Sequence, residues 1–133
     1  MKRRHLLRRR HGHSLASDKT RWDKLHADYA KAYQASRDNE IALRVKYGDG
    51  NWRMWCSRGE KTRTEKLEAR RDKIGDKIVD LLVRISPRGE AWLSGAPAFW
   101  IRGDLTWEDA IRPKNEPLSV VVPAPWGADR GLT

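Results

Sequence analysis

The sequence predicts a small, mainly α-helical domain. Apolar residues recur in alternating steps of three and four along two long segments, and a glycine-rich link separates them, which predicts an antiparallel helical hairpin over residues 14–86. Tryptophan and proline become frequent after residue 86. We expect residues 87–133 to pack on the hairpin within the same domain, as a short helix and one or two short strands. Residues 1–13 form a basic N-terminal arm.

The first helix is predicted to begin near residue 14 and to end before residue 51. Ser14 or Ser17 can cap its N-terminus, and Asp18 in the first turn complements the helix dipole. The link Gly48-Asp-Gly-Asn51 stops the helix with residues that accept positive φ. Apart from a polar position at residue 39, one helix face is formed by Trp22, Leu25, Tyr29, Ala32, Ser36 and Leu43.

The second helix is predicted to follow the polar stretch 57–62 and to end before Pro87, which disfavours helical geometry at the preceding residue. Gly75 weakens this helix by roughly 1 kcal/mol relative to alanine, so a close contact is expected there. We expect the two helices to cover each other's seams within one chain; the alternative is a homodimer that pairs the seams between chains. The seam residues are Leu67, Arg71, Ile74, Ile78, Leu81 and Ile85.

The C-terminal segment has weaker patterns. Thr106 starts a capping box and predicts a short helix over 107–111. Residues 118–122 are the best strand candidate, because they are rich in valine and bounded by prolines, whereas 98–101 fit a short strand or a helical turn. We expect three tryptophans to pin this segment onto the hairpin: Trp92, Trp100 and Trp107.

The arm has the most concentrated charge in the chain. The first ten residues carry six cations and no acid, so the rest of the chain carries only +4 of the net charge of +10. We expect the free arm to be flexible, because its charges repel one another. Such an arm favours a polyanionic partner through counterion release from phosphates, DNA more than RNA. The alternatives are a solvated tail and an organelle transit peptide. The predicted phosphate contacts are Lys2, Arg3, Arg4, Arg8, Arg9 and Arg10.

A second basic patch is predicted at the link between the helices. It comprises Arg53, Arg58, Lys61 and Arg63. Trp52 and Trp55 lie beside these cations, where their rings can stack on bases or anchor a protein partner. The alternative for both tryptophans is burial in the core.

The residue pattern does not favour an enzyme, a metal site or a cofactor. Three of the four histidines lie in the arm, and Cys56 has no evident base beside it. No phosphate-cradling glycine loop occurs. Three acids step by four along the second helix, where ion pairing with neighbouring cations explains them better than a Mg²⁺ site does. These acids are Asp72, Asp76 and Asp80, and the cations are Lys73, Lys77 and Arg84.

The expected compartment is the cytoplasm. The longest near-apolar stretch, 78–85, is interrupted by Asp80 and Arg84 and is too short to cross a bilayer. Residues 6 and 7 are too few to form the apolar core of a secretory signal. The single cysteine, Cys56, fits a reducing environment.

Three stretches carry a resemblance to known sequences. The run from Phe99 to Pro113 and the run from Glu116 to Pro123 look like small uncharacterised proteins encoded on bacterial plasmids and integrative elements, and the stretch from Arg53 to Arg71 is similar to them in character. The resemblance covers the last two thirds of the chain. It implies a mobile-element context, in which small basic proteins serve DNA transfer, replication control, regulation or evasion of host defence. It implies no catalytic residues.

These observations lead to two functional hypotheses. The first is a non-enzymatic nucleic-acid-binding accessory or regulatory protein of a mobile element, which uses the arm for phosphate contacts. The alternative is a protein-binding inhibitor of a host nuclease or defence complex, of the anti-CRISPR or anti-restriction type, with the tryptophans at the link as anchors.

Overall fold

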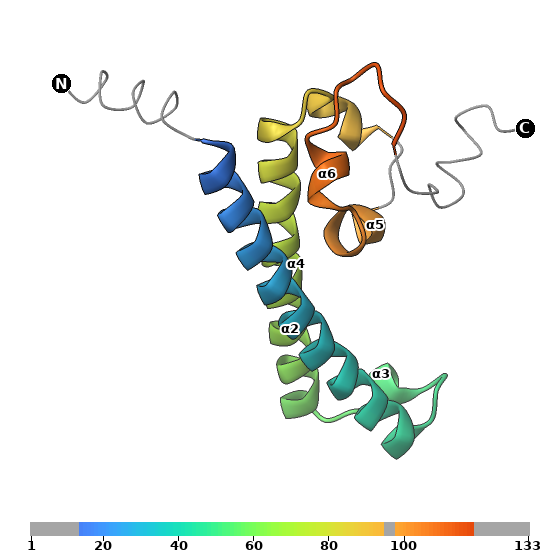
Figure 1. The fold of residues 1–133 in the computed structure, drawn as a ribbon. Helices are drawn as coiled ribbons and strands as arrows, with labels where there is room; N and C mark the ends of the chain where they lie inside the picture. The colour runs from blue at the N-terminus through green and yellow to red at the C-terminus, as the bar shows by residue number, and fades with distance from the viewer. Residues whose placement is uncertain (1–13, 95–97, 119–133) are drawn as a thin grey trace, which may run out of the picture.

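The computed structural model of the chain describes residues 14–94 and 98–118. Helices dominate this part of the chain, and it contains no strand. The predicted mainly helical class, with a pair of long helices, is confirmed (Figure 1). The predicted strand at 118–122 lies outside the described residues except for Leu118. None of the described helices combines the length and apolar character that crossing a membrane requires.

The first long helix, α2, spans Leu15–Tyr47. Its N-cap is Ser14, whose hydroxyl accepts a hydrogen bond from the Ser17 backbone N–H at 3.0 Å, so Ser14 rather than Ser17 caps the helix. The helix ends at Gly48, which adopts a φ of 96°, a left-handed value that favours glycine. The glycine-rich link therefore acts as the stop that the sequence predicts.

The link contains one unpredicted helical turn, α3, which spans Trp52–Trp55. The second long helix, α4, spans Arg58–Ile85. It begins with a capping box: the Ser57 hydroxyl accepts from the Glu60 N–H at 3.1 Å, and the Glu60 carboxylate accepts from the Ser57 N–H at 2.8 Å. The Ser-x-x-Glu signature is present in the sequence, and it fixes the start of α4 nine residues before the first predicted seam position at Leu67.

The two long helices run antiparallel and side by side (Figure 1). Contacts along their whole length show this. The Lys46 ammonium bonds the Glu60 carboxylate at 2.8 Å near the link, and the Arg84 guanidinium bonds the Asp18 carboxylate at 3.1 Å at the other end. We call the end that carries α3 the bend, and the end that carries Ser14 and Ile85 the open end.

The C-terminal segment packs against the open half of the helix pair. It forms a 3₁₀ turn, η1, over Gly89–Leu93, then α5 over Ala98–Gly103 and α6 over Trp107–Ala110. The helical alternative for 98–101 is thus the one observed. One cluster forms the core here and joins both long helices to this segment: Trp22, Leu25, Ile78, Leu81, Leu82, Trp92, Ile101, Leu105 and Ala110.

The three tryptophans that we expected to pin this segment have different positions. Trp92 is fully buried, and its indole N–H donates to the Ser86 hydroxyl at 2.8 Å. Trp107 is half-buried against the core and meets the Trp22 ring edge-on, with ring centroids 6.0 Å apart. The side chain of Trp100 lies outside the described part of the structure.

Candidate nucleic-acid interface

The predicted arm contacts lie outside the described residues. They are Lys2, Arg3, Arg4, Arg8, Arg9 and Arg10. The described chain begins at Ser14, the N-cap of α2, so the arm joins the domain at the open end of the helix pair.

The four cations of the second predicted patch do not form one group. The Arg53 guanidinium bonds the Glu68 carboxylate at 2.7 Å and lies 4.4 Å from the centre of the Trp52 ring. An ion pair and a cation–π contact therefore already engage it. Arg58, Lys61 and Arg63 are exposed and form no ion pair within the described part of the chain. Three of the four predicted cations are thus available to an external anion.

The two tryptophans at the bend differ in exposure. Trp52 is only 5% exposed, and the guanidinium groups of Arg44 and Arg53 lie at its ring, so its faces are not open to a base. Trp55 is 63% exposed, as expected of a contact residue. Of the two tryptophans, only Trp55 has a ring open to a partner, whereas Trp52 holds the turn α3 against the helix pair.

A row of exposed cations extends along α4. It comprises five exposed cations: Arg63, Lys66, Arg70, Lys73 and Lys77. We call these residues the α4 basic stripe. Their steps of three, four, three and four place all five on one flank of the helix, over about 21 Å. None of them forms an ion pair with a described residue.

Sequence reasoning found only Arg63 of this stripe. It assigned Lys73 and Lys77 to ion pairs with the acids of α4, and that expectation is wrong. The Asp76 carboxylate bonds Arg102 of α5 at 2.9 Å, and the Asp72 carboxylate bonds Arg71 at 3.0 Å. Lys73 and Lys77 form no ion pair with a described residue.

Positive and negative charge lie on opposite flanks of α4. Residues two apart are about 160° around a helix from each other, so Glu68 faces away from Lys66 and Asp72 faces away from Arg70. The acidic flank is the one that Arg53 and Arg102 reach from outside α4. Figure 1 shows α3, α5 and α6 on that same side of the helix pair. The stripe therefore lies on the side that these elements leave uncovered.

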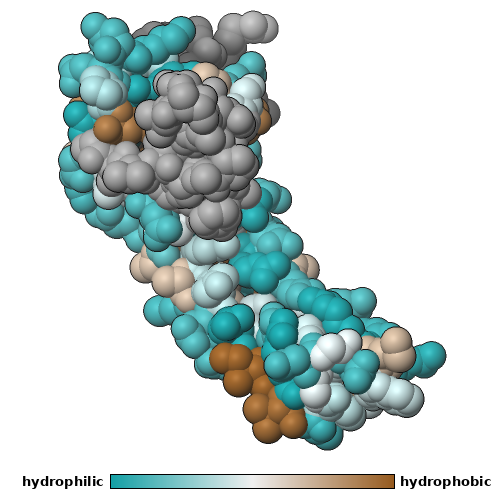
Figure 2. Space-filling view, turned by 90° about the vertical axis from the view of Figure 1, so that its right-hand side faces the viewer, coloured by the Kyte–Doolittle hydropathy of each residue, from teal (hydrophilic) through white to brown (hydrophobic). Residues whose placement is uncertain are grey.

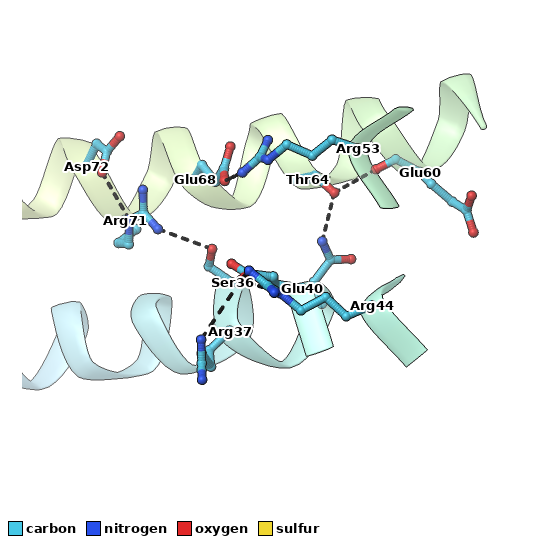
Figure 3. Close-up of polar contacts among 11 residues, drawn as sticks. Ser36, Arg37, Glu40, Arg44, Arg53, Glu60, Thr64, Glu68, Arg71 and Asp72 are labelled. Carbon is cyan, nitrogen blue, oxygen red and sulfur yellow. Dashed lines mark hydrogen bonds and ion pairs between the residues drawn. The ribbon is translucent and has the colours of Figure 1, made fainter. Parts of the chain in front are cut away.

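Polar contacts hold the bend half of the helix pair in register (Figure 3). The Asn39 amide donates to the Thr64 hydroxyl at 2.8 Å, and Arg71 donates to the Ser36 hydroxyl at 3.5 Å. Arg44 bonds the Glu40 carboxylate of its own helix at 2.7 Å. Arg44 and Arg71 are each paired with a carboxylate of their own helix, unlike the five cations of the stripe.

Glu60 ties the end of α2 to the start of α4. Its carboxylate accepts from the Lys46 ammonium at 2.8 Å, from the Tyr47 hydroxyl at 2.7 Å and from the Ser57 N–H at 2.8 Å. The hydrogen bond from Lys46 is the largest of the causes that lower the pKa of Glu60 to about 2. Glu60 is therefore ionised at neutral pH and joins the last turn of α2 to the first turn of α4.

The described histidine and cysteine have local surroundings that the structure defines. No group of three or more His, Cys, Asp or Glu side chains that could hold a metal ion occurs among the described residues. His26 packs on the Trp22 ring, with ring centroids 4.4 Å apart, and burial lowers its pKa. The Cys56 thiol lies 3.6 Å from the Arg53 carbonyl oxygen at the end of α3.

Comparison with known proteins adds no relative. No protein-family model matches the chain, and no curated protein or solved structure is significantly similar to it. The resemblance to proteins of plasmids and integrative elements stays a prediction.

Proposed function

We propose that this protein binds nucleic acid without catalysis, as an accessory or regulatory protein of a mobile genetic element. The observation that carries the proposal is the α4 basic stripe, with five exposed cations on one flank, none of them paired with a described residue. Most other described arginines serve an internal contact, as Arg53, Arg71 and Arg102 do. A surface that keeps its cations free in this way suits an external polyanion.

The physical basis is release of the counterions that condense on a phosphate backbone. A protein that neutralises about five phosphates is expected to give a log–log salt slope near −4 to −5. A rise from 50 to 200 mM salt then weakens binding several-hundred-fold. The arm carries six cations of its own, so the arm and the stripe together supply more contacts than this.

The helix pair and the arm have different tasks in this proposal. The cations of the stripe stand on a long helix that is capped at its start and packed against α2, so their spacing is fixed. The arm joins α2 at Ser14, at the open end, and adds phosphate contacts there. The stripe positions the protein, and the arm increases its affinity. DNA is the partner that we favour over RNA.

Neutralising the arm tests this proposal. Replacing all six arm cations by glutamine keeps the chain length and removes the charge. We expect binding of a fluorescent oligonucleotide to weaken and its salt slope to become shallower, as measured by anisotropy at several salt concentrations. Deletion of residues 2–10 should give the same result. An affinity and a slope that both stay at the wild-type values would contradict the role of the arm.

The bend favours protein binding as a second candidate function, namely inhibition of a host nuclease or defence complex. Met54 is 74% exposed beside Trp55, and Val45 is 82% exposed on α2 near this end. Figure 2 shows a hydrophobic patch at the bend. Exposed tryptophan is the residue type most often found at binding hot spots.

A nuclease-treated preparation distinguishes the two candidates. An inhibitor would still form a stoichiometric complex with a host protein, and Trp55→Ala would break that complex. Tyr33→Ala is the matched control, because Tyr33 is also an exposed aromatic residue of the helix pair. Trp52→Ala would be uninformative, because that ring is buried. Light scattering of the same preparation tests the hypothesis of a homodimer.

A further inference from the structure

We propose that the α4 basic stripe binds the double-stranded form of nucleic acid, along its phosphate backbone and without sequence preference. This inference rests on the proposed function and names the ligand class of that site. It depends on three properties of α4: the straight row of its cations, the residue types that it lacks, and the packing of α2 beside it.

The row of cations matches the charge distribution of a duplex. Successive stripe residues are separated by about 4.5 or 6 Å along the axis of one straight helix, from Arg63 to Lys77. A duplex carries one negative charge per about 1.7 Å of its axis, which gives about twelve phosphates over the same 21 Å. Both partners are stiff and extended, so several of the five cations can face phosphates at once without bending either partner.

The stripe lacks the groups that single strands require. Proteins bind single strands by stacking bases on aromatic side chains beside a basic groove. The sequence of α4 contains no aromatic residue. The exposed aromatic residues Tyr33 and Trp55 belong to the other side of the helix pair, where Tyr33 borders Arg102 of α5 and Trp55 ends α3. The stripe could therefore contact the phosphates of a single strand but could not stack on its bases.

Contact with the phosphate backbone of the duplex also explains why we expect no preference for particular bases. A helix in the major groove lies between two phosphate ridges, so entry of α4 would bring the acidic flank that carries Glu68 and Asp76 towards one of them. The stripe, a single row of cations on the other flank, suits contact along one phosphate ridge. The sequence of α4 also contains no Asn or Gln, the side chains that pair with adenine.

The end of the stripe is marked by acids. Asp80 follows Lys77 by three residues, and at the next turn Arg84 bonds Asp18 of α2. The favourable potential of the stripe for phosphate therefore ends near Lys77. This limit defines which substitutions reduce binding.

The test compares two double variants of the full chain that lose the same charge. Lys73→Gln with Lys77→Gln removes two stripe cations. Lys19→Gln with Arg37→Gln removes two exposed cations of α2 that pair locally with Asp23 and Glu40. The probes are a 20-base-pair DNA duplex, a second duplex of unrelated sequence, a duplex RNA and a 20-nucleotide single strand. Circular dichroism confirms that both variants fold.

We expect both DNA duplexes to bind alike and more tightly than the single strand. At 0.1 M salt, the loss of two contacts should weaken duplex binding on the order of 50-fold and make the salt slope shallower by about 2. The control pair should weaken it less than about twofold. The duplex RNA distinguishes the two sources of duplex phosphate, and preference for either duplex over the single strand supports the inference.

Two outcomes would overturn different statements. If the single strand binds as tightly as the duplexes, or if the stripe pair behaves like the control pair, the inference about the stripe is wrong while nucleic-acid binding stands. If the wild-type chain binds none of the probes at 50 mM salt, the proposed function itself is wrong.

Discussion

Arg102 reaches from α5 to α4 and lies against Gly75. A Cβ atom at Gly75 would be 2.6 Å from both Cδ and Nε of Arg102, which is too close for a real contact. The space left by the missing side chain therefore seats the arginine that bonds Asp76. The sequence predicts a close contact at Gly75 from a glycine inside a helix, but it does not indicate which residue comes close.

This contact predicts that the effect of Gly75→Ala on the free energy of unfolding depends on whether Arg102 is present. Gly75→Ala alone should give little gain or a loss in the free energy of unfolding, because the new methyl group displaces Arg102. In an Arg102→Ala background the same substitution should stabilise the fold by about 0.5–1 kcal/mol, the helix propensity of alanine over glycine. Urea unfolding of the four proteins measures this cycle. Equal effects in the two backgrounds would show that Arg102 does not occupy the site.

Ser86 ends α4 and serves the core at the same time. Its hydroxyl accepts the indole N–H of Trp92 at 2.8 Å and the backbone N–H of Arg88 at 3.1 Å. Ser86→Ala removes this acceptor from a buried donor, so we expect a loss of about 1–3 kcal/mol in unfolding free energy. Ser17→Ala, an exposed serine of α2, is the control and should change stability little. A Ser86→Ala protein as stable as the control would contradict the role of this hydrogen bond.

At the scale of elements, α4 presents three different surfaces: an apolar seam, an acidic flank and the basic stripe. The seam is predictable, because apolar spacing reports the face that packs, and every predicted seam position is buried or half-buried. The stripe is not, because acids and cations three or four residues apart predict local pairs. Two of the acids are instead held from outside α4: Arg53 bonds Glu68, and Arg102 bonds Asp76, 26 residues away in sequence.

The bend is the element whose stability depends most clearly on pH. The pKa of Glu60 is lowered in the folded state from its ordinary value of 4.5 to about 2. The stabilisation is therefore fully present above about pH 4.5 and is lost as the pH falls towards 2. Unfolding free energies measured between pH 7 and 2 should show this loss, and Glu60→Gln should reduce it. A pH dependence unchanged in Glu60→Gln would contradict the three hydrogen bonds to this carboxylate.

The short elements mark the limit of prediction from the sequence. The helical turn α3 has no apolar periodicity, and it forms because Trp52 is buried against the pair beneath Arg44 and Arg53. Its neighbour Trp55, only three residues later, is exposed. From residue type alone, the two tryptophans would be expected to have the same exposure. Only their packing in the fold shows that one is buried and the other exposed.

For the whole molecule, the apolar core residues are unevenly distributed between the two ends of the helix pair, and this determines which end is more stable. The main apolar cluster lies at the open end, whereas the bend half is held by Leu43, Trp52 and a few polar contacts. We expect backbone amides of α4 near Ile78 and Leu82 to exchange more slowly than those near Thr64. Hydrogen exchange followed by mass spectrometry measures this difference. Uniform protection along α4 would contradict it.

The charge of the whole molecule is also divided. The arm joins at the open end, the stripe runs along the uncovered side, and the acids of α4 face α3 and α5. The concentration of charge in the arm is evident from the sequence, whereas the direction in which the stripe faces requires the fold. The described arginines that bond Glu68 and Asp76 do not neutralise the stripe, which lies on the other flank of α4.

The salt dependence of duplex binding by the intact chain tests this account most directly. We predict a linear fall of the logarithm of the binding constant with the logarithm of salt concentration between 50 and 200 mM, with a slope of about −4 or steeper. A slope near zero, or no binding at 50 mM salt, would contradict it.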